Sequence, residues 1–323
     1  MRRKFTLITI MLIIMTVLAA CAGEQKQPQP IEQPNQEVEQ NQQDTAQLPA
    51  EDRAGNKITI PSEINKIISI SPSNTEMIVD LGFGDKLVAV DKYSGGIEGI
   101  PENIPYFDIM NPDVEQLVAL EPDIIYATGM SLSDGSDPFK PIKDLGITVA
   151  YIPASDSIEG IYKDIVFIAD SLQVSGKGHE LVDTMKTKID EFKEIGSTIE
   201  DKKTVYFEIA GAPNLYSFGS GVFLNEMIEL LGAENILAEQ EKWISVSDEV
   251  IVAANPDIIL TNVNYIENAV DEIKNRTGWE NVTAIKNNDV YYIDNNASSL
   301  SNHHIVKALD QMAEAIYPDV YTK

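Results

Sequence analysis

Histidines are the side chains of this sequence best suited to bind a metal, and His303 and His304 are the only two that are adjacent. Neighbouring histidines rarely bind one ion together, and the third histidine, His179, is remote in sequence. No dedicated zinc or manganese site is therefore expected. Two interpretations of the pair remain. Either His303 gives an axial ligand or a hydrogen bond to a bound chelate, or both side chains are exposed where the final helix begins.

Catalytic motifs do not occur in the sequence. There is no GxSxG, no HExxH and no catalytic cysteine, and the carboxylates are spread along the chain as on a solvated surface. The net charge of -27, from 24 basic and 51 acidic residues, argues against nucleic acid, whose phosphates need a basic footprint. We therefore predict that the chain is not an enzyme and carries no cofactor.

Polar residues follow a predicted strand in each half of the chain. Ser73 and Glu76 have the spacing of a capping box, with Ser73 as the N-cap. Helix N-termini at the carboxyl edge of a parallel sheet also offer free N–H donors, so Ser73 and Asn74 are candidates for ligand contact as well as for capping. Gly219-Ser220-Gly221 takes the corresponding place in the second half, without a GxGxxG or P-loop pattern.

β-rich runs alternate with helical patterns from Ile58 onward. This alternation predicts βαβ units and a mostly parallel sheet, hence an α/β fold. Strands are expected at 67–71, 87–91, 123–128, 148–152, 204–209 and 257–260, and helices at 75–81, 114–120, 224–231 and 249–254.

The order of these elements repeats, and 323 residues suffice for two modest cores. Residues 76–82 (EMIVDLG) return as 226–232 (EMIELLG), and 115–125 (EQLVALEPDII) return as 249–259 (EVIVAANPDII). The repeat predicts two similar lobes and makes Glu115 equivalent to Glu249. The alternative explanation is that a glycine after a helix and Pro-Asp before a strand are common in α/β proteins.

One helix is expected to join the halves, because residues 176–195 carry apolar side chains at three-to-four spacing. It would run roughly 30 Å, about the width of a small domain. A single stiff helix limits hinge closure, unlike two or three flexible connecting strands.

The N-terminal residues predict export. Residues 1–20 have the basic start, apolar run and small residues of a secretory signal. The following Cys21 is the only cysteine and completes a pattern, LAAC, that resembles the bacterial lipobox, so we predict that Cys21 is lipidated. An incidental cysteine or an uncleaved anchor helix is the alternative. Residues 21–50, rich in Gln, Glu and Pro, are expected to be a flexible tether.

Five longer segments, in this order, resemble the vitamin B12 and ferric-siderophore binding family. This family comprises class III, or helical-backbone, substrate-binding lipoproteins of ABC transporters. The segments are IISISPSNTEMIVDLGFGDKLVAVDKYSGG, NPDVEQLVALEPDIIYATG, VYFEIAGAPNLYSFGSGVFLNEMIELLGAENIL, ISVSDEVIVAANPDIIL and WENVTAIKNNDVYYID. The resemblance implies two Rossmann-like lobes joined by a single long helix, a shallow ligand cleft between them and no catalysis.

The resemblance also implies a permease partner. In this family one glutamate of each lobe docks onto arginines of the paired permease subunits, and the matching residues are Glu115 and Glu249. A glutamate favoured near a helix N-terminus by the helix dipole is the simpler alternative. The expected domains are a signal peptide (1–20), the tether (21–50), an N-terminal lobe (51–155), a helical connection (156–200) and a C-terminal lobe (201–323).

Large apolar side chains on loops that follow or flank strands are the ligand-binding candidates, because aromatic and thioether groups suit a large planar ligand. Each could instead be an ordinary core or surface residue. The candidates are Tyr93, Tyr106 and Met130 from the first lobe and Tyr216, Trp243 and Tyr265 from the second.

Charge decides between ligand classes. Arginines usually grip anionic siderophores, and past the signal peptide only Arg53 and Arg276 remain, neither of them on an expected cleft segment. Lys92 could supply one positive charge. We therefore expect a neutral or cationic ligand, a corrinoid first, a siderophore second and haem third.

Taken together, the expected protein is a solute-binding lipoprotein on the outer face of the cytoplasmic membrane that hands its ligand to an ABC permease dimer. The alternatives are a structural or adhesive surface lipoprotein and a binder of a free metal ion.

Overall fold

The N-terminal lobe is built on a parallel sheet of five strands. The computed structural model describes residues 48–131 and 137–321. The strands lie in the order β3-β2-β1-β4-β5, so chain order reverses beside β1. They are β1 (Ile67–Ser69), β2 (Leu87–Asp91), β3 (Tyr106–Phe107), β4 (Ile124–Ala127) and β5 (Thr148–Tyr151).

Apolar runs form these strands because helices cover both faces of the sheet. Successive side chains point to opposite faces, so Ile67 and Ile68 lie in two different hydrophobic cores. The core around Ile67 includes residues of α1 and α4, and the core around Ile68 includes residues of α2 and α3. These helices are α1 (Pro72–Ile78), α2 (Val114–Ala119), α3 (Lys140–Asp144) and α4 (Ile158–Ser171).

The C-terminal lobe repeats this design with a parallel sheet in the order β11-β10-β6-β8 and a separate antiparallel pair, β7-β9. Its strands are β6 (Thr204–Glu208), β7 (Tyr216–Phe218), β8 (Glu234–Asn235), β9 (Trp243–Ser245), β10 (Ile258–Thr261) and β11 (Val290–Tyr292). Its helices are α6 (Phe223–Leu230), α7 (Asp248–Ala254), α8 (Ala269–Lys274), α9 (Thr283–Asn287), α10 (Asn295–Ser299), α11 (Ile305–Ile316) and α12 (Pro318–Tyr321).

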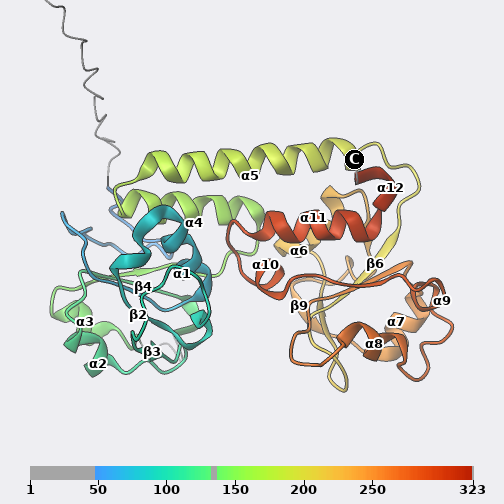
Figure 1. The fold of residues 1–323 in the computed structure, drawn as a ribbon, viewed down its shortest axis with the longest axis horizontal. Helices are drawn as coiled ribbons and strands as arrows, with labels where there is room; N and C mark the ends of the chain where they lie inside the picture. The colour runs from blue at the N-terminus through green and yellow to red at the C-terminus, as the bar shows by residue number, and fades with distance from the viewer. Residues whose placement is uncertain (1–47, 132–136, 322–323) are drawn as a thin grey trace, which may run out of the picture. The chain divides into compact units, whose positions relative to one another are not determined.

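The long helix α5 (Ser175–Gly196) runs along both lobes, next to α4 (Figure 1). Its 22 residues give a length of about 33 Å. Val182, Met185 and Ile189 are buried on one face and belong to a core that also holds strand residues of both sheets. The two lobes therefore share one continuous hydrophobic core. No helix in the described part of the chain combines the length and apolar character needed to cross a membrane.

The predicted fold class is confirmed, and the predicted strands and helices agree with the structure to within a few residues. The capping box is wrong: α1 begins at Pro72 after Ser71, and the Ser73 hydroxyl instead lies 2.9 Å from the Ser71 hydroxyl. Proline is preorganised for the first helical position, which moves the start of the helix upstream. Cys21 and most of the tether lie outside the described residues, and the domain boundaries stay predictions.

One local feature was not predicted. Helix α1 continues into a single π-helical turn, η1 (Val79–Phe83), in which Gly82 has a φ of 93°. This left-handed conformation favours glycine and ends the helix. Such turns occur often at functional sites, and η1 carries Asp80 toward the C-terminal lobe.

Candidate functional site

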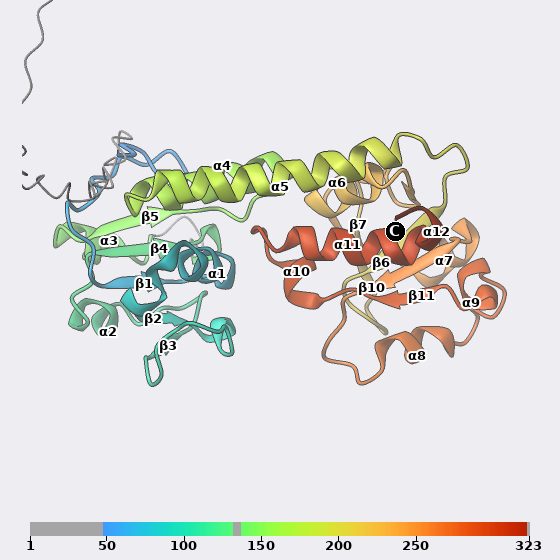
Figure 2. The ribbon, with the colours of Figure 1, turned by 45° about the horizontal axis from the view of Figure 1, so that its top comes forward.

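A cavity of about 700 Å³ lies between the two lobes, in the size range of small-molecule sites. The segments that line it follow β1, β2, β10 and β11, so the carboxyl edges of both parallel sheets face it, as in other open α/β folds. Figure 2 shows α1 of the first lobe opposite α10 of the second. The lining residues are Pro72, Glu76, Val79, Asp80, Tyr93, Gly95, Gly96, Ile97, Glu98, Asn264, Asn295, Asn296, Leu300 and His304.

The charged groups of this cleft are acidic. Glu76, Asp80 and Glu98 bring three carboxylates, and three asparagines add amides that can donate and accept hydrogen bonds. Within the described part of the chain, no arginine or lysine lines the cleft. Such a lining suits a neutral or cationic ligand and repels an anionic one.

Helix geometry places Glu76 and Asp80 together, because residues four apart share one helix face. Glu76 is held from the other lobe by Asn302, whose Nδ2 donates to Oε2 over 2.5 Å. Asn302 also accepts a hydrogen bond from the backbone N–H of His304 (2.8 Å). The carboxylate of Glu76 therefore has a fixed position at the cleft.

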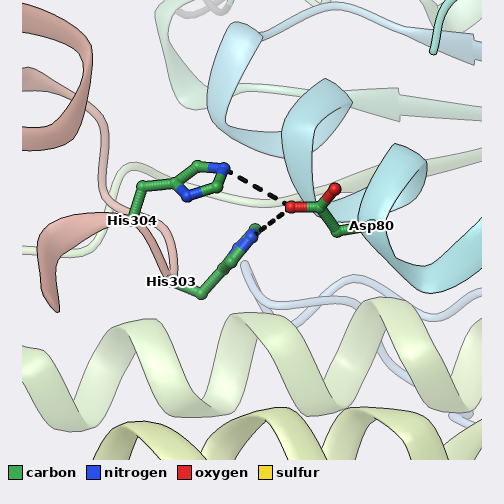
Figure 3. Close-up of side chains that lie close together, drawn as sticks. All are labelled: Asp80, His303 and His304. Atoms are coloured by element: carbon green, nitrogen blue, oxygen red, sulfur yellow. Dashed lines mark hydrogen bonds and ion pairs between the residues drawn. The ribbon is translucent and has the colours of Figure 1, made fainter. Parts of the chain in front are cut away.

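Asp80 meets both adjacent histidines across the gap between the lobes (Figure 3). Its Oδ2 atom lies 2.5 Å from Nε2 of His303 and 3.4 Å from Nε2 of His304. Of the two interpretations of the pair, exposure of both side chains is wrong for His303, whose side chain is only 8% exposed. The segment before α11 turns toward the N-terminal lobe, where Asp80 contacts this ring.

The pKa values of these groups are shifted in different directions. The hydrogen bond from His303 lowers the pKa of Asp80. Burial raises the pKa of Glu76, although the hydrogen bond from Asn302 opposes the shift. Burial also lowers the pKa of His304, and the adjacent His303 adds to this effect. Titratable side chains from both lobes therefore meet at this edge of the cleft.

Tyr93 stands in the short 3-10 helix η3 (Lys92–Ser94), which a buried carboxylate holds. Asp91 ends β2 and accepts a hydrogen bond from the backbone N–H of Tyr93 (2.7 Å) and one from the Ser94 hydroxyl. The Ser94 hydroxyl is also 3.0 Å from that of Thr75 in α1. This network explains how a largely exposed tyrosine has a defined place at the cleft.

The six predicted apolar residues are all exposed, but only Tyr93 lines the cavity. Tyr216 and Trp243 lie on β7 and β9 rather than on loops, where the tyrosine hydroxyl donates to the carbonyl oxygen of Trp243 over 3.3 Å. Tyr265 accepts a hydrogen bond from the N–H of Gly211 (2.9 Å). The remaining two are Tyr106 on β3 and Met130 on the short helix η4 (Gly129–Ser131).

The other predicted residues lie outside the cavity lining. Asn74 is buried within α1, and neither it nor Ser73 lines the cleft. Glu115 and Glu249 are exposed in the first turns of α2 and α7. A hydrogen bond from Ser247 lowers the pKa of Glu249.

The basic residues considered for ligand binding are paired with carboxylates. Arg276 donates to both carboxylate oxygens of Glu208, over 2.7 and 3.0 Å, and also binds Glu272. Arg53 binds Asp164 over 2.5 Å. Lys92 lies 2.6 Å from Asp108.

Sequence reasoning missed the carboxylates and amides of the cleft. Asp80 could have been found, because the internal repeat aligns it with the apolar Leu230, although the pair Val79 and Glu229 differs as well. Nothing comparable distinguishes Glu98, Asn295 or Asn296.

Comparison with known proteins agrees with this architecture. The sequence profile of the family described as periplasmic binding protein matches residues 67–297. The "Uncharacterized ABC transporter substrate-binding lipoprotein YvrC" of Bacillus subtilis (strain 168) is 31% identical over 99% of both chains. The "Vitamin B12-binding protein" of Yersinia pestis (strain Pestoides F) is 28% identical over 67% of this chain and 75% of its own.

A solved structure from Staphylococcus epidermidis ATCC 12228, described as a possible iron-binding (periplasmic solute-binding) protein, has a TM-score of 0.70 and 29% identity. The similarity covers 79% of this chain and all of that one. The resemblance found in the sequence is thereby confirmed, and the chain belongs to the periplasmic binding protein family.

Proposed function

We propose that this chain is the extracytoplasmic solute-binding lipoprotein of an ABC importer and that it captures a neutral or cationic metal chelate in the cleft between its lobes. The observation that carries the proposal is the cleft itself, which lies at the carboxyl edges of two parallel sheets and is lined by carboxylates and amides. A corrinoid is the first candidate, a neutral or cationic siderophore the second and haem the third.

Charge supports a neutral or cationic solute over an anionic one. An anionic chelate would meet three carboxylates in the cleft, while Arg53, Arg276 and Lys92 are already bound to acidic partners. The net charge of -27 would also repel an anion at long range. The B12-binding relative in Yersinia supports placing a corrinoid first.

Delivery rests on the two glutamates related by the repeat. Glu115 and Glu249 are both exposed, each in the first turn of its helix, so each is accessible to an arginine of a permease subunit. A two-fold permease presents the same basic patch twice, and two matched glutamates suit that symmetry. Lipidation of Cys21 would keep the protein at the membrane, and the relative named a lipoprotein supports it.

A thermal-shift panel tests the choice of ligand. Cobalamin, cobinamide, haem and ferric siderophores of different charge are compared, and a ligand at 100 times its Kd should add about 2.7 kcal/mol of stability. Tyr93→Ala should weaken the shift, whereas Tyr292→Ala, which changes an exposed tyrosine outside the cleft, should not. A strong shift with an anionic ferric tris-catecholate alone would contradict the proposed ligand class. A chain that binds no small solute would favour the structural or adhesive alternative.

A further inference from the structure

Asp80, His303 and His304 together have the donor set of a transition-metal site. Each offers one ligand atom, and these atoms lie within 4.8 Å of one another. Two imidazoles with one carboxylate suit zinc, iron, nickel or copper rather than magnesium or calcium, which prefer oxygen ligands alone. Figure 3 shows the three side chains converging from opposite lobes.

The distances are close to those that a metal requires. Around a tetrahedral ion with bonds of about 2.1 Å, neighbouring ligand atoms are about 3.4 Å apart. Nε2 of His304 and Oδ2 of Asp80 are already 3.4 Å apart. Nε2 of His303 lies 2.5 Å from the same oxygen, so this contact must lengthen by about 1 Å. The side chain of Asp80 is 44% exposed and is free to make that shift.

The local charge also favours a cation. Oε2 of Glu76 lies 3.9 Å from Nε2 of His304 and adds a second carboxylate beside the three donors. Two carboxylates and two neutral imidazoles balance the charge of a divalent ion. The nearby Lys177 directs its ammonium group to the carbonyl oxygen of Leu81 (2.9 Å).

The cluster can be reached from two sides. Asp80 and His304 line the main cleft, whereas Asp80 and His303 line a second cavity of about 420 Å³ beside α5. Glu180 and Thr184 of α5 also border this second cavity. An ion can therefore reach the three ligands from the second cavity while a solute occupies the main cleft.

We propose that Asp80, His303 and His304 bind one divalent first-row transition ion of the zinc type, which ties the two lobes together at the wall of the cleft. The site was not expected from the sequence because its third ligand, Asp80, lies on the other lobe, 223 residues away from His303. The proposed ion is separate from any metal inside the proposed solute, because protein side chains supply all three of its ligands.

The test is titration of the purified full chain, without a histidine tag, after chelator treatment. Zn²⁺ is followed by calorimetry, and Co²⁺ by the visible absorption of its tetrahedral complexes. One equivalent of Zn²⁺ is expected to bind and to raise Tm. His303→Gln, His304→Gln and Asp80→Asn should each weaken binding at least about tenfold, since loss of a group that merely orients a ligand already costs 10- to 100-fold.

His179→Gln is the matched control, because this exposed histidine of α5 is not part of the cluster. It should bind Zn²⁺ like the unaltered chain. Circular dichroism in chelator shows whether each variant remains folded. The proposal is overturned if Zn²⁺ binds no better than Mg²⁺, or if the His303→Gln/His304→Gln double variant keeps full affinity. The solute panel repeated in chelator reports on the solute proposal separately.

Discussion

Replacement of Arg276 tests whether the second arginine serves structure rather than ligand binding. Its side chain is 7% exposed and that of Glu208 is 1% exposed, so Arg276→Met leaves a buried carboxylate without its bidentate partner. Breaking a buried pair in this way costs about 3–5 kcal/mol. With a urea m-value of about 3 kcal/mol/M, the unfolding midpoint should fall by about 1 M or more.

The pH dependence of stability tests the same prediction independently. Burial raises the pKa of Glu208 even with Arg276 in place, and removal of the arginine raises it further. The native variant then binds a proton that the unfolded chain, with its ordinary glutamate pKa, has released. Stability of Arg276→Met should therefore increase as the pH falls from 8 toward 5, relative to the unaltered chain.

A double variant separates the pair from its surroundings. Arg276→Met with Glu208→Met removes both charges, so it should regain much of the lost stability, because apolar replacements of a buried pair are often neutral or better. Affinity for the solute should be unchanged in all folded variants. The reasoning is refuted if Arg276→Met changes stability by less than about 1 kcal/mol, or if it abolishes solute binding while the protein remains folded.

Three further predictions concern helix packing, transport and anchoring. Gly178→Ala should lower the free energy of unfolding by about 1–3 kcal/mol, because its Cβ would lie 2.3 Å from a methyl group of α4. Gly129→Ala, with 4.0 Å to its nearest neighbour, should be nearly neutral, and equal effects in urea unfolding would argue against this packing. Glu115→Ala combined with Glu249→Ala should abolish uptake of the solute in cells without changing its affinity; normal uptake would remove the docking assignment. Cys21→Ser should release the protein from membranes, and an unmodified Cys21 in mass spectrometry of the native protein would show that no lipid is attached.

The fold was predictable because it follows from local patterns. Buried parallel strands need apolar residues on both faces, and such runs as 67–71 are visible in the sequence. The internal repeat then indicated two lobes, and the apolar spacing of 176–195 indicated the helix that joins them. The strand and helix patterns each lie within about 20 residues of sequence, and the repeat is visible by direct comparison of two segments, which is why sequence reasoning detects them.

The cleft was harder to predict because its residues come together only through tertiary structure. Exposure of His303 at the start of the final helix was one of two interpretations, whereas in the structure Asp80 of the other lobe contacts its largely buried ring. Tyr93 was identified by residue type, but the same criterion selected Tyr265 and Trp243, which do not line the cavity. Residue type indicates which side chains can bind a ligand, and the fold decides which of them meet.

The continuous core through α4 and α5 affects how binding energy is used. A binder whose lobes must swing together first populates a rare closed form, and its apparent affinity falls by the fraction of molecules in that form. Here the lobes are joined by packed side chains such as Met185 and Ile189, so the empty cleft is already organised. Little free energy is then needed to move the lobes, so contacts with the solute contribute almost fully to affinity. A permease would consequently distinguish the loaded from the empty protein by the surface that the solute adds at the mouth of the cleft, and only slightly by a change of domain orientation.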